Sequence, residues 1–265
     1  MDYKKLCFQV QEIARTTGNF IRDEQKKISA KNIEIKSVAS LVTYVDKTAE
    51  QQIVSALKAL IPDSGFVAEE GTADSNNEKY TWFVDPLDGT TNYIHGLAPH
   101  SVSIALAEGD TMVLGVVYEV GANEMFYAWR DSAAYCNGEE IHSANREKSE
   151  DTLIATGFPY YDFDRMDDYI EAMKVLMQST RGIRRFGSAA IDLCYIAAGR
   201  FDAFWEHALH AWDVAAGVFI LQQAGGKTVD FNGGNNWLFG GELVSASGSY
   251  FPEFYGIINK HLGTK

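Results

Sequence analysis

Trp82-Phe83-Val84-Asp85-Pro86-Leu87-Asp88-Gly89-Thr90-Thr91-Asn92 is the stretch from which the fold and the chemistry of this chain are worked out. Its first three residues are apolar and favour β-structure, so they predict a buried strand. We expect Asp85 to end that strand, because Pro86 has no N–H to donate to a sheet ladder. Gly89 then permits a tight bend. The carboxylates of Asp85 and Asp88 therefore lie close together at a strand end.

No Lys or Arg separates these two carboxylates in the sequence. Two neighbouring carboxylates repel each other unless a cation or a proton lies between them. The turn also offers backbone N–H groups from Gly89 onward and the hydroxyls of Thr90 and Thr91. Carboxylate oxygens beside backbone N–H groups suit a hard cation and a phosphate held together. An isolated Asp-Pro-x-Asp would more often be a plain turn, so the rest of the chain has to support this interpretation.

Taken whole, the stretch resembles the signature of the inositol monophosphatase family, a group of Mg²⁺-dependent, lithium-sensitive phosphatases. Three further segments match family motifs in the expected order. Leu41–Asp46 matches L-V-T-x-x-D, Glu69-Glu70 matches the acids of G-E-E, and Trp212–Ala216 matches W-D-x-A-A. The resemblance runs from Lys36 through Asp213, nearly the whole chain. Two departures are Ala68, where the family has Gly, and Ser40, where many members have Asp.

The composition excludes several classes of protein. The chain has 265 residues, of which 46% are hydrophobic, so it is long and apolar enough for a sizeable core. Its net charge of −13 disfavours bare nucleic-acid binding and would repel an anionic substrate unless metal ions offset it. Three cysteines without Cys-x-x-Cys spacing indicate reduced core thiols in a cytoplasmic protein. We recognise neither a signal peptide nor an apolar run that would span a membrane.

The pattern of elements predicts an α/β protein. Residues 6–20 and 49–60 have the periodicity of amphipathic helices, and residues 102–136 predict short antiparallel strands. From residue 153 onward, strands alternate with helices, which indicates α and β layers. The resemblance implies an α-β-α-β-α sandwich of the inositol monophosphatase and fructose-1,6-bisphosphatase type. We expect residues 1–145 to form an N-terminal subdomain of helices and antiparallel sheet, and 146–265 an α/β subdomain.

The resemblance also implies roles for individual residues. Two or three Mg²⁺ ions would be held by a set of oxygen ligands, which are Glu69, Asp85, the Leu87 carbonyl, Asp88 and Asp213. Asp46, Glu69 and Thr90 would orient and activate the attacking water. Substrate contacts would come from Asp88 and the phosphate-binding turn, Gly89, Thr90 and Thr91, and on the ring side from Ser188, Ala189 and Glu206.

Each of these residues also has a plain structural explanation. Asp46, Asp213 and Ser188 each stand where a helix N-cap is expected. The plain explanation of Glu206 is a surface acid at the end of a strand. His207 and His210 are interpreted as packing or hydrogen-bonding residues, because hard cations favour oxygen ligands.

The function expected from the resemblance is hydrolysis of a small-molecule phosphate monoester, with myo-inositol monophosphate as substrate, by a homodimer. Fructose-1,6-bisphosphatase activity is an alternative. Nucleotide 3′-phosphatase activity is another, although such enzymes usually have D-G-T-K-E-F where this chain has Asp88–Tyr93. A third alternative is a protein-binding role in a transcription or RNA-assembly complex. We expect no direct contact with nucleic acid and none with a membrane.

Overall fold

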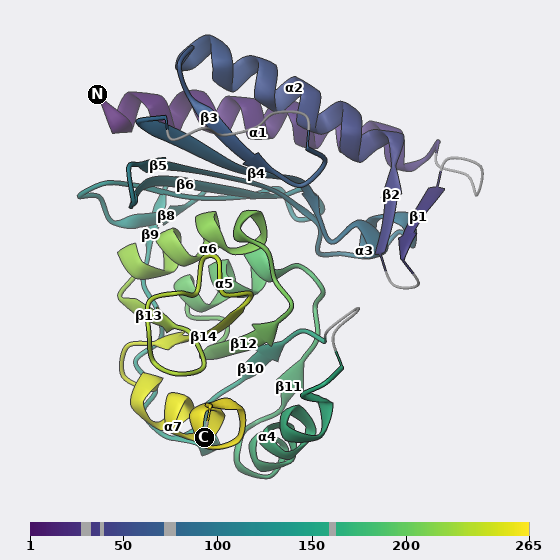
Figure 1. The fold of residues 1–265 in the computed structure, drawn as a ribbon. Helices are drawn as coiled ribbons and strands as arrows, with labels where there is room; N and C mark the ends of the chain where they lie inside the picture. The colour runs from purple at the N-terminus through teal and green to yellow at the C-terminus, as the bar shows by residue number, and fades with distance from the viewer. Residues whose placement is uncertain (28–32, 38–39, 72–77, 159–162, 265) are drawn as a thin grey trace.

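Helix and sheet layers alternate through the molecule in the order helix, sheet, helix, sheet, helix (Figure 1). The computed structural model describes residues 1–264 except 28–32, 38–39, 72–77 and 159–162, and it describes no side chain within 28–42, Ser40 included. The predicted α-β-α-β-α sandwich is confirmed. In the described part of the chain, no helix is both long and apolar enough to cross a bilayer.

The first sheet has seven strands, and its spatial order follows the chain. The strands are β3 (Gly65–Ala68), β4 (Tyr80–Asp88), β5 (Ser101–Glu108), β6 (Thr111–Glu119), β7 (Glu124–Trp129), β8 (Ala134–Cys136) and β9 (Glu139–Ile141). The prediction of an antiparallel sheet is wrong at one edge, where β3 and β4 pair in parallel. In a parallel pair both strands run in the same direction, so β4 begins at the same end of the sheet as β3. All other neighbours are antiparallel.

Helices α1 (Tyr3–Gln25) and α2 (Tyr44–Leu60) cover the outer face of this sheet (Figure 1). Their apolar stripes bury residues such as Val10, Ile21 and Ile53 in one core cluster with Trp82 and Val116 of the strands. Between the two helices, β1 (Ile33–Ser37) and β2 (Ser40–Thr43) form an antiparallel pair. The first two predicted helices are confirmed as the outer layer.

The second sheet has five strands in the order β11-β10-β12-β14-β13. They are β10 (Ile154–Thr156), β11 (Ile183–Arg184), β12 (Ala203–His207), β13 (Gly226–Val229) and β14 (Glu242–Ser247). Strand β10 pairs in parallel with β11 and β12, whereas β12, β14 and β13 are antiparallel. Helices α4 (Met166–Ser179) and α7 (Phe251–Leu262) cover its outer face, and the one-turn helix η2 spans Ser149–Asp151.

Helices α5 (Ala189–Ala197) and α6 (Ala211–Gln223) form the middle layer, between the two sheets (Figure 1). Both are apolar around almost their whole circumference, as expected of a helix buried on two sides. One core cluster joins Val117 and Phe126 of the first sheet to Leu193 and Phe219 of these helices. The two halves of the chain therefore share a core, and a division at residue 145 stays a prediction.

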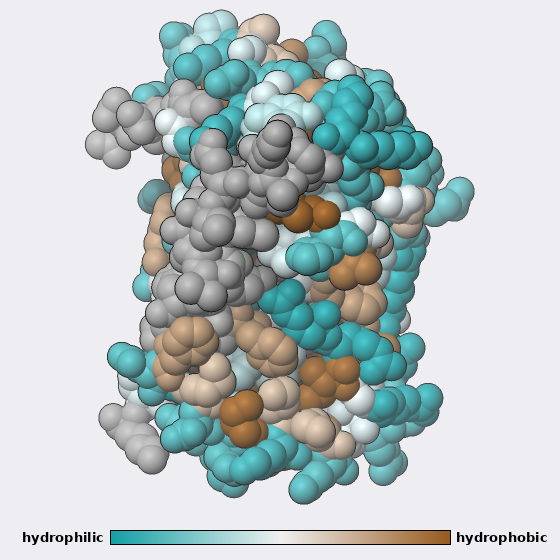
Figure 2. Space-filling view, turned by 90° about the vertical axis from the view of Figure 1, so that its right-hand side faces the viewer, coloured by the Kyte–Doolittle hydropathy of each residue, from teal (hydrophilic) through white to brown (hydrophobic). Residues whose placement is uncertain are grey.

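The lower half of the face shown in Figure 2 gathers apolar side chains, whereas the upper half is largely polar. This lower half belongs to the second sheet and its outer helices. Among the described residues, Val175 and Met177 of α4 and the nearby Phe163 are large, apolar and exposed. A homodimer remains an expectation from the resemblance.

Gly115 of β6 lets the first sheet approach α6 closely. A Cβ built at Gly115 would lie 2.8 Å from the carbonyl oxygen of Ala216 and 3.3 Å from its Cα. Since those atoms are backbone, Gly115→Ala has to push the helix away from the sheet. We expect it to lower the free energy of unfolding by about 1–3 kcal/mol, measured by urea denaturation. Gly256→Ala is the control, because its Cβ meets nothing within 4 Å on α7 and should stabilise the helix by about 0.5–1 kcal/mol. Equal stability of Gly115→Ala and wild type would contradict the packing argument.

Candidate active site

The Asp-Pro-Leu-Asp segment forms a bulge near the end of β4. We expected Asp85 to end this strand, but pairing with β5 continues to Asp88, with a shift of register between the two aspartates. Pro86 lies inside that irregularity, where the strand can do without a donor. Asp85 is buried, and its Oδ1 accepts a hydrogen bond of 2.9 Å from the Leu87 N–H. The bulge thus holds the Asp85 carboxylate in one orientation.

Gly89 directly after the bulge has to be glycine for two reasons. Its φ of +89° lies in the left-handed region, which side chains disfavour. A Cβ would also lie 3.0 Å from the Pro99 carbonyl oxygen and 3.1 Å from that of Gly187. A short helix that we did not predict, α3 (Thr90–Ile94), begins at the next residue. The first N–H groups of a helix have no partner within it, so this turn presents backbone donors, next to the exposed Thr91.

Asp46 and Thr90 are in direct contact. The Thr90 hydroxyl lies 3.0 Å from Asp46 Oδ1 and 3.0 Å from the Leu87 carbonyl oxygen. Asp46 Oδ2 accepts from the N–H and the hydroxyl of Thr43, at 2.8 and 2.7 Å. We expected Asp46 to be the N-cap of α2, and this expectation is wrong. Thr43 is the N-cap, and Asp46 completes a capping box three residues later. Burial raises the pKa of Asp46, although these hydrogen bonds lower it.

Asp213 has the same position in α6 as Asp46 has in α2. His210 is the N-cap, and its N–H donates to Asp213 Oδ2 at 2.7 Å. The expectation that Asp213 would be the N-cap is therefore wrong by one helical turn. The hydrogen bond fixes a carboxylate at the start of a buried helix. The His210 ring stacks on Trp212 at 4.6 Å, and the His207 ring packs against Tyr169 at 5.5 Å, as expected of packing residues.

Asp88 joins the bulge to the start of α5. Its Oδ2 accepts from the Ser188 hydroxyl at 2.6 Å and from the Ala190 N–H at 2.9 Å. Ser188 is the N-cap of α5 by position, but its hydroxyl bonds Asp88 rather than the helix. Burial raises the pKa of Asp88 to about 6, although the bonds from Ser188, Ala190 and Ala189 lower it.

Glu69 follows β3, and its loop is held by an acid that sequence reasoning missed. The buried Glu50 of α2 accepts a 2.7 Å hydrogen bond from the N–H of Glu70. The signal for Glu50 was its place on the apolar stripe of α2, in register with Ile53 and Leu57. Glu69 itself is half-buried.

Four predicted metal ligands act on one another electrostatically. Burial, and then the charges of Glu69, Asp88 and Asp213, raise the pKa of Asp85 well above its ordinary range. Burial raises the pKa of Asp213 in the same way, with Asp88 and Glu69 among the charges that add to it. The structure therefore brings Glu69, Asp85, Asp88 and Asp213, from distant parts of the chain, into one carboxylate cluster.

A second acidic group lies beyond Asp88. Burial raises the pKa of Glu206 on β12 to about 8, against the charge of Arg185, which lowers it. Burial and then the charge of Glu206 raise the pKa of Asp192 on α5 well above its usual range. Asp192 is almost fully buried, and its Oδ1 has no hydrogen-bond partner among the residues that the structure describes. Neither Asp192 nor Arg185 was singled out from sequence, although Asp192 is an acid within an otherwise apolar helix.

The carboxylate cluster suits a divalent cation of the Mg²⁺ type. All its side-chain donors are oxygen, and a hard cation offsets the repulsion that raises the pKa values. Asp85, Asp88 and Asp213 each direct one oxygen to a backbone N–H. Among the described residues, no three His, Cys, Asp or Glu side chains yet surround a single point closely enough to hold an ion.

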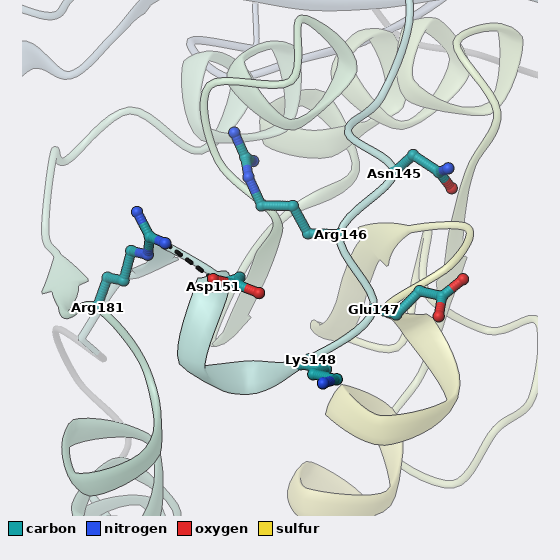
Figure 3. Close-up of a pocket in the computed structure, with 6 residues that line it drawn as sticks. All are labelled: Asn145, Arg146, Glu147, Lys148, Asp151 and Arg181. Atoms are coloured by element: carbon teal, nitrogen blue, oxygen red, sulfur yellow. Dashed lines mark hydrogen bonds and ion pairs between the residues drawn. The ribbon is translucent and has the colours of Figure 1, made fainter.

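A hollow of about 380 Å³ lies elsewhere, where the chain passes from the first sheet to the second (Figure 3). It is lined by Asn145, Arg146, Glu147, Lys148, Asp151 and Arg181. Arg181 pairs with Asp151 at 2.8 Å, and Arg146 pairs with the buried Asp202 at 2.7 Å. No predicted site residue lines this hollow, and its paired charges indicate a structural role.

Comparison with known proteins agrees with the geometry. The sequence profile described as the inositol monophosphatase family matches residues 2–262. The chain is 38% identical to the Nus factor SuhB of Pseudomonas aeruginosa over 94% of both chains, and 35% identical to the inositol-1-monophosphatase of Mesorhizobium japonicum over 89% of both. The crystal structure of the extragenic suppressor protein suhB from Bartonella henselae superposes with a TM-score of 0.91 at 33% identity, covering 97% of this chain and 100% of that one. With its fold, its ordered motifs and these relatives in agreement, the chain belongs to the inositol monophosphatase family.

Proposed function

We propose that this protein hydrolyses phosphate monoesters of polyols, with myo-inositol monophosphate as the first candidate, in a Mg²⁺-dependent reaction. The observation that carries this proposal is the cluster of Glu69, Asp85, Asp88 and Asp213 beside the Gly89–Thr90 turn. In a chain with net charge −13, such a cluster attracts cations and repels a bare phosphate. A phosphate ester therefore has to bind together with the metal.

The four carboxylates and the Leu87 carbonyl oxygen would together hold two or three metal ions. Mg²⁺ bound there would supply positive charge that activates a water and stabilises the phosphate and its leaving oxygen. The N–H groups of Gly89 and Thr90 would donate to phosphate oxygens, supported by the left-handed Gly89 and the start of α3.

Thr90 and Asp46 would orient the attacking water. The Thr90 hydroxyl has one proton, which it can donate toward Asp46 Oδ1. Its lone pairs then remain to accept a hydrogen bond from the water. Asp46 is held in this orientation by Thr43, so the arrangement is fixed before substrate binds.

On the leaving-group side, Glu206 would accept hydrogen bonds from ring hydroxyls, with Ser188 and Ala189 at the adjacent helix start. Glu206 is buried behind Asp88, whose charge raises its pKa. Glu206 therefore lies close to the carboxylate cluster, although we do not count it as a metal ligand.

A substrate panel with phosphate release as the readout tests the proposal. We expect inositol monophosphate to be hydrolysed with Mg²⁺ and not with EDTA, and Mg²⁺ to raise the melting temperature because it offsets the buried repulsion. The panel includes fructose 1,6-bisphosphate and a nucleoside 3′-phosphate. Preference for either of these would replace the inositol assignment, and hydrolysis that is unchanged in EDTA would refute the metal role.

Measured above pH 8, where Glu206 is ionised, Glu206→Ala should lower kcat/KM for inositol monophosphate by about ten- to hundredfold, because a hydrogen bond to a charged group is worth about 1.5–3 kcal/mol. Hydrolysis of an aryl phosphate, which lacks ring hydroxyls, should barely change, and neither should the Mg²⁺ dependence. Glu206→Gln retains an acceptor, so its kcat/KM for inositol monophosphate should fall less than that of Glu206→Ala. Equal loss on both esters would show that Glu206 supports the metals instead.

A second candidate is a binding role in a transcription or RNA-assembly complex, favoured by the relatives named Nus factor SuhB. The acidic charge of this chain favours a protein partner over direct contact with RNA. The two functions are separable, because a catalytically inactive Asp85→Asn protein should keep a partner-binding surface. A homodimer, which light scattering would detect, is part of this proposal.

A further inference from the structure

The Arg185 side chain packs against Gly187, which adjoins the Gly89 turn. A Cβ at Gly187 would overlap the Arg185 Nη1 atom, and Gly187 has a φ of +84°. The carbonyl oxygen of Gly187 in turn lies 3.1 Å from the Cβ position of Gly89. Asn92 strengthens the junction, because its Nδ2 donates to the carbonyl oxygen of Phe186 at 2.7 Å. The guanidinium is thus folded back beside the turn that follows Asp88.

The segment after β10 contacts Arg185 and Glu206 with two consecutive residues. The Arg185 guanidinium carbon lies 5.9 Å from the centre of the Phe158 ring. A Cβ at the preceding Gly157 would overlap the carboxylate of Glu206, so that carboxylate packs directly on the Gly157 backbone. One short segment therefore fixes a cation and a carboxylate side by side.

The charge of Arg185 reaches three acids of the site. It lowers the pKa of Glu206, Asp192 and Asp88, each of which burial raises. Glu206 responds to it more than to any other charge. Arg185 is half-buried, whereas its neighbour Arg184 is exposed, so the two arginines of this segment differ in surroundings.

We infer that Arg185 is a specificity-determining residue that acts with Glu206 on the leaving group, and that the pair selects phosphate esters whose leaving group carries neighbouring hydroxyls. This inference rests on the proposed function. A guanidinium only donates hydrogen bonds and a carboxylate only accepts them. A hydroxyl does both, so two adjacent hydroxyls match the pair.

The acids around Arg185 favour a neutral polyol over a second phosphate group. A second anionic group at the guanidinium would also approach Glu206, Asp192 and Asp88. Each of these acids repels such a group when it is ionised, and the net charge of −13 adds to the repulsion. Hydroxyls bring no charge and can bond both members of the pair.

Arg185→Met tests the inference, since it removes the donors and keeps an unbranched stem. With saturating Mg²⁺, we expect kcat/KM for inositol monophosphate to fall by about tenfold or more, mainly through KM, and that for an aryl phosphate to stay within about twofold. Arg184→Met, the matched control on the same segment, should leave kcat/KM for both esters within about twofold of wild type.

Phe158→Ala changes a surface position that contacts the Arg185 guanidinium. It should give a smaller loss of the same selectivity without endangering the fold. The double variant Arg185→Met with Glu206→Ala should lose less kcat/KM for inositol monophosphate than the product of the two single losses.

Equal losses on the inositol and aryl esters would overturn the inference and make Arg185 a structural counter-charge. A larger loss on fructose 1,6-bisphosphate than on inositol monophosphate would also overturn it, in favour of a second phosphate. Strict additivity with Glu206→Ala would refute a shared pair of hydroxyls. Failure of the proposed function appears separately, as wild-type protein that does not hydrolyse inositol monophosphate.

Discussion

Asp85→Asn is expected to lower Mg²⁺-dependent phosphate release by at least about a hundredfold while the fold remains intact. Asp85 is the member of the carboxylate cluster on which Glu69, Asp88 and Asp213 all act, so it is the ligand most suited to be shared between ions. Asparagine is nearly isosteric, and its carbonyl oxygen can still accept from the Leu87 N–H. The substitution therefore removes the charge and preserves the bulge.

Thermal unfolding with and without Mg²⁺ separates a catalytic from a structural effect of this change. The rise in melting temperature that we expect Mg²⁺ to produce in wild type should be largely lost in Asp85→Asn. Asp110→Asn, in an exposed turn between β5 and β6, is the matched control and should keep both activity and the response to Mg²⁺. Turnover near that of wild type in folded Asp85→Asn would remove Asp85 from the proposed site.

Thr90→Val is expected to lower turnover by about a hundredfold or more, the range in which a positioned proton-transfer group contributes. Valine keeps the branched shape but removes the hydroxyl that bridges to Asp46 Oδ1. Thr90→Ser keeps that hydroxyl and should retain most of the activity. KM should change less than kcat, because the hydroxyl acts on the water rather than on the substrate.

Activity of Thr90→Val within about threefold of wild type would contradict the water-orienting role. A similar loss in Thr90→Ser would instead indicate that the methyl group, and hence packing around α3, is what the site requires. Circular dichroism of both variants checks that α3 and its surroundings remain folded.

The layered fold was largely predictable, and the exact place of the aspartates was not. Asp46 and Asp213 were each assigned to a helix N-cap, yet both occupy the third helical position of a capping box. Sequence periodicity locates a helix but leaves its first turn uncertain by several residues. The roles of the two aspartates depend on that turn, because it decides which backbone N–H fixes the carboxylate.

Local chemistry alone also failed to mark several residues around the site. Glu50 and Asp192 lie on apolar helix faces and gain a role only from what packs against them. Gly157 directly follows a strand and Gly187 precedes a helix start, as many glycines do, and only the structure shows the Glu206 and Arg185 side chains against them. Apart from that of Arg185 with Gly187, these contacts join positions remote in sequence, which no local pattern encodes.

By itself, the sequence determined the family, the α-β-α-β-α order and the oxygen-rich chemistry of the Asp85–Thr90 turn, because motifs and periodicity are local properties of the chain. Tertiary structure alone decided that β3 and β4 run in parallel, that α5 and α6 share a core with both sheets, and that Arg185 lies beside Glu206. The physical reason is that burial and the charges of neighbours, which set the pKa of Asp85 and Glu206, arise only when distant segments exclude water together.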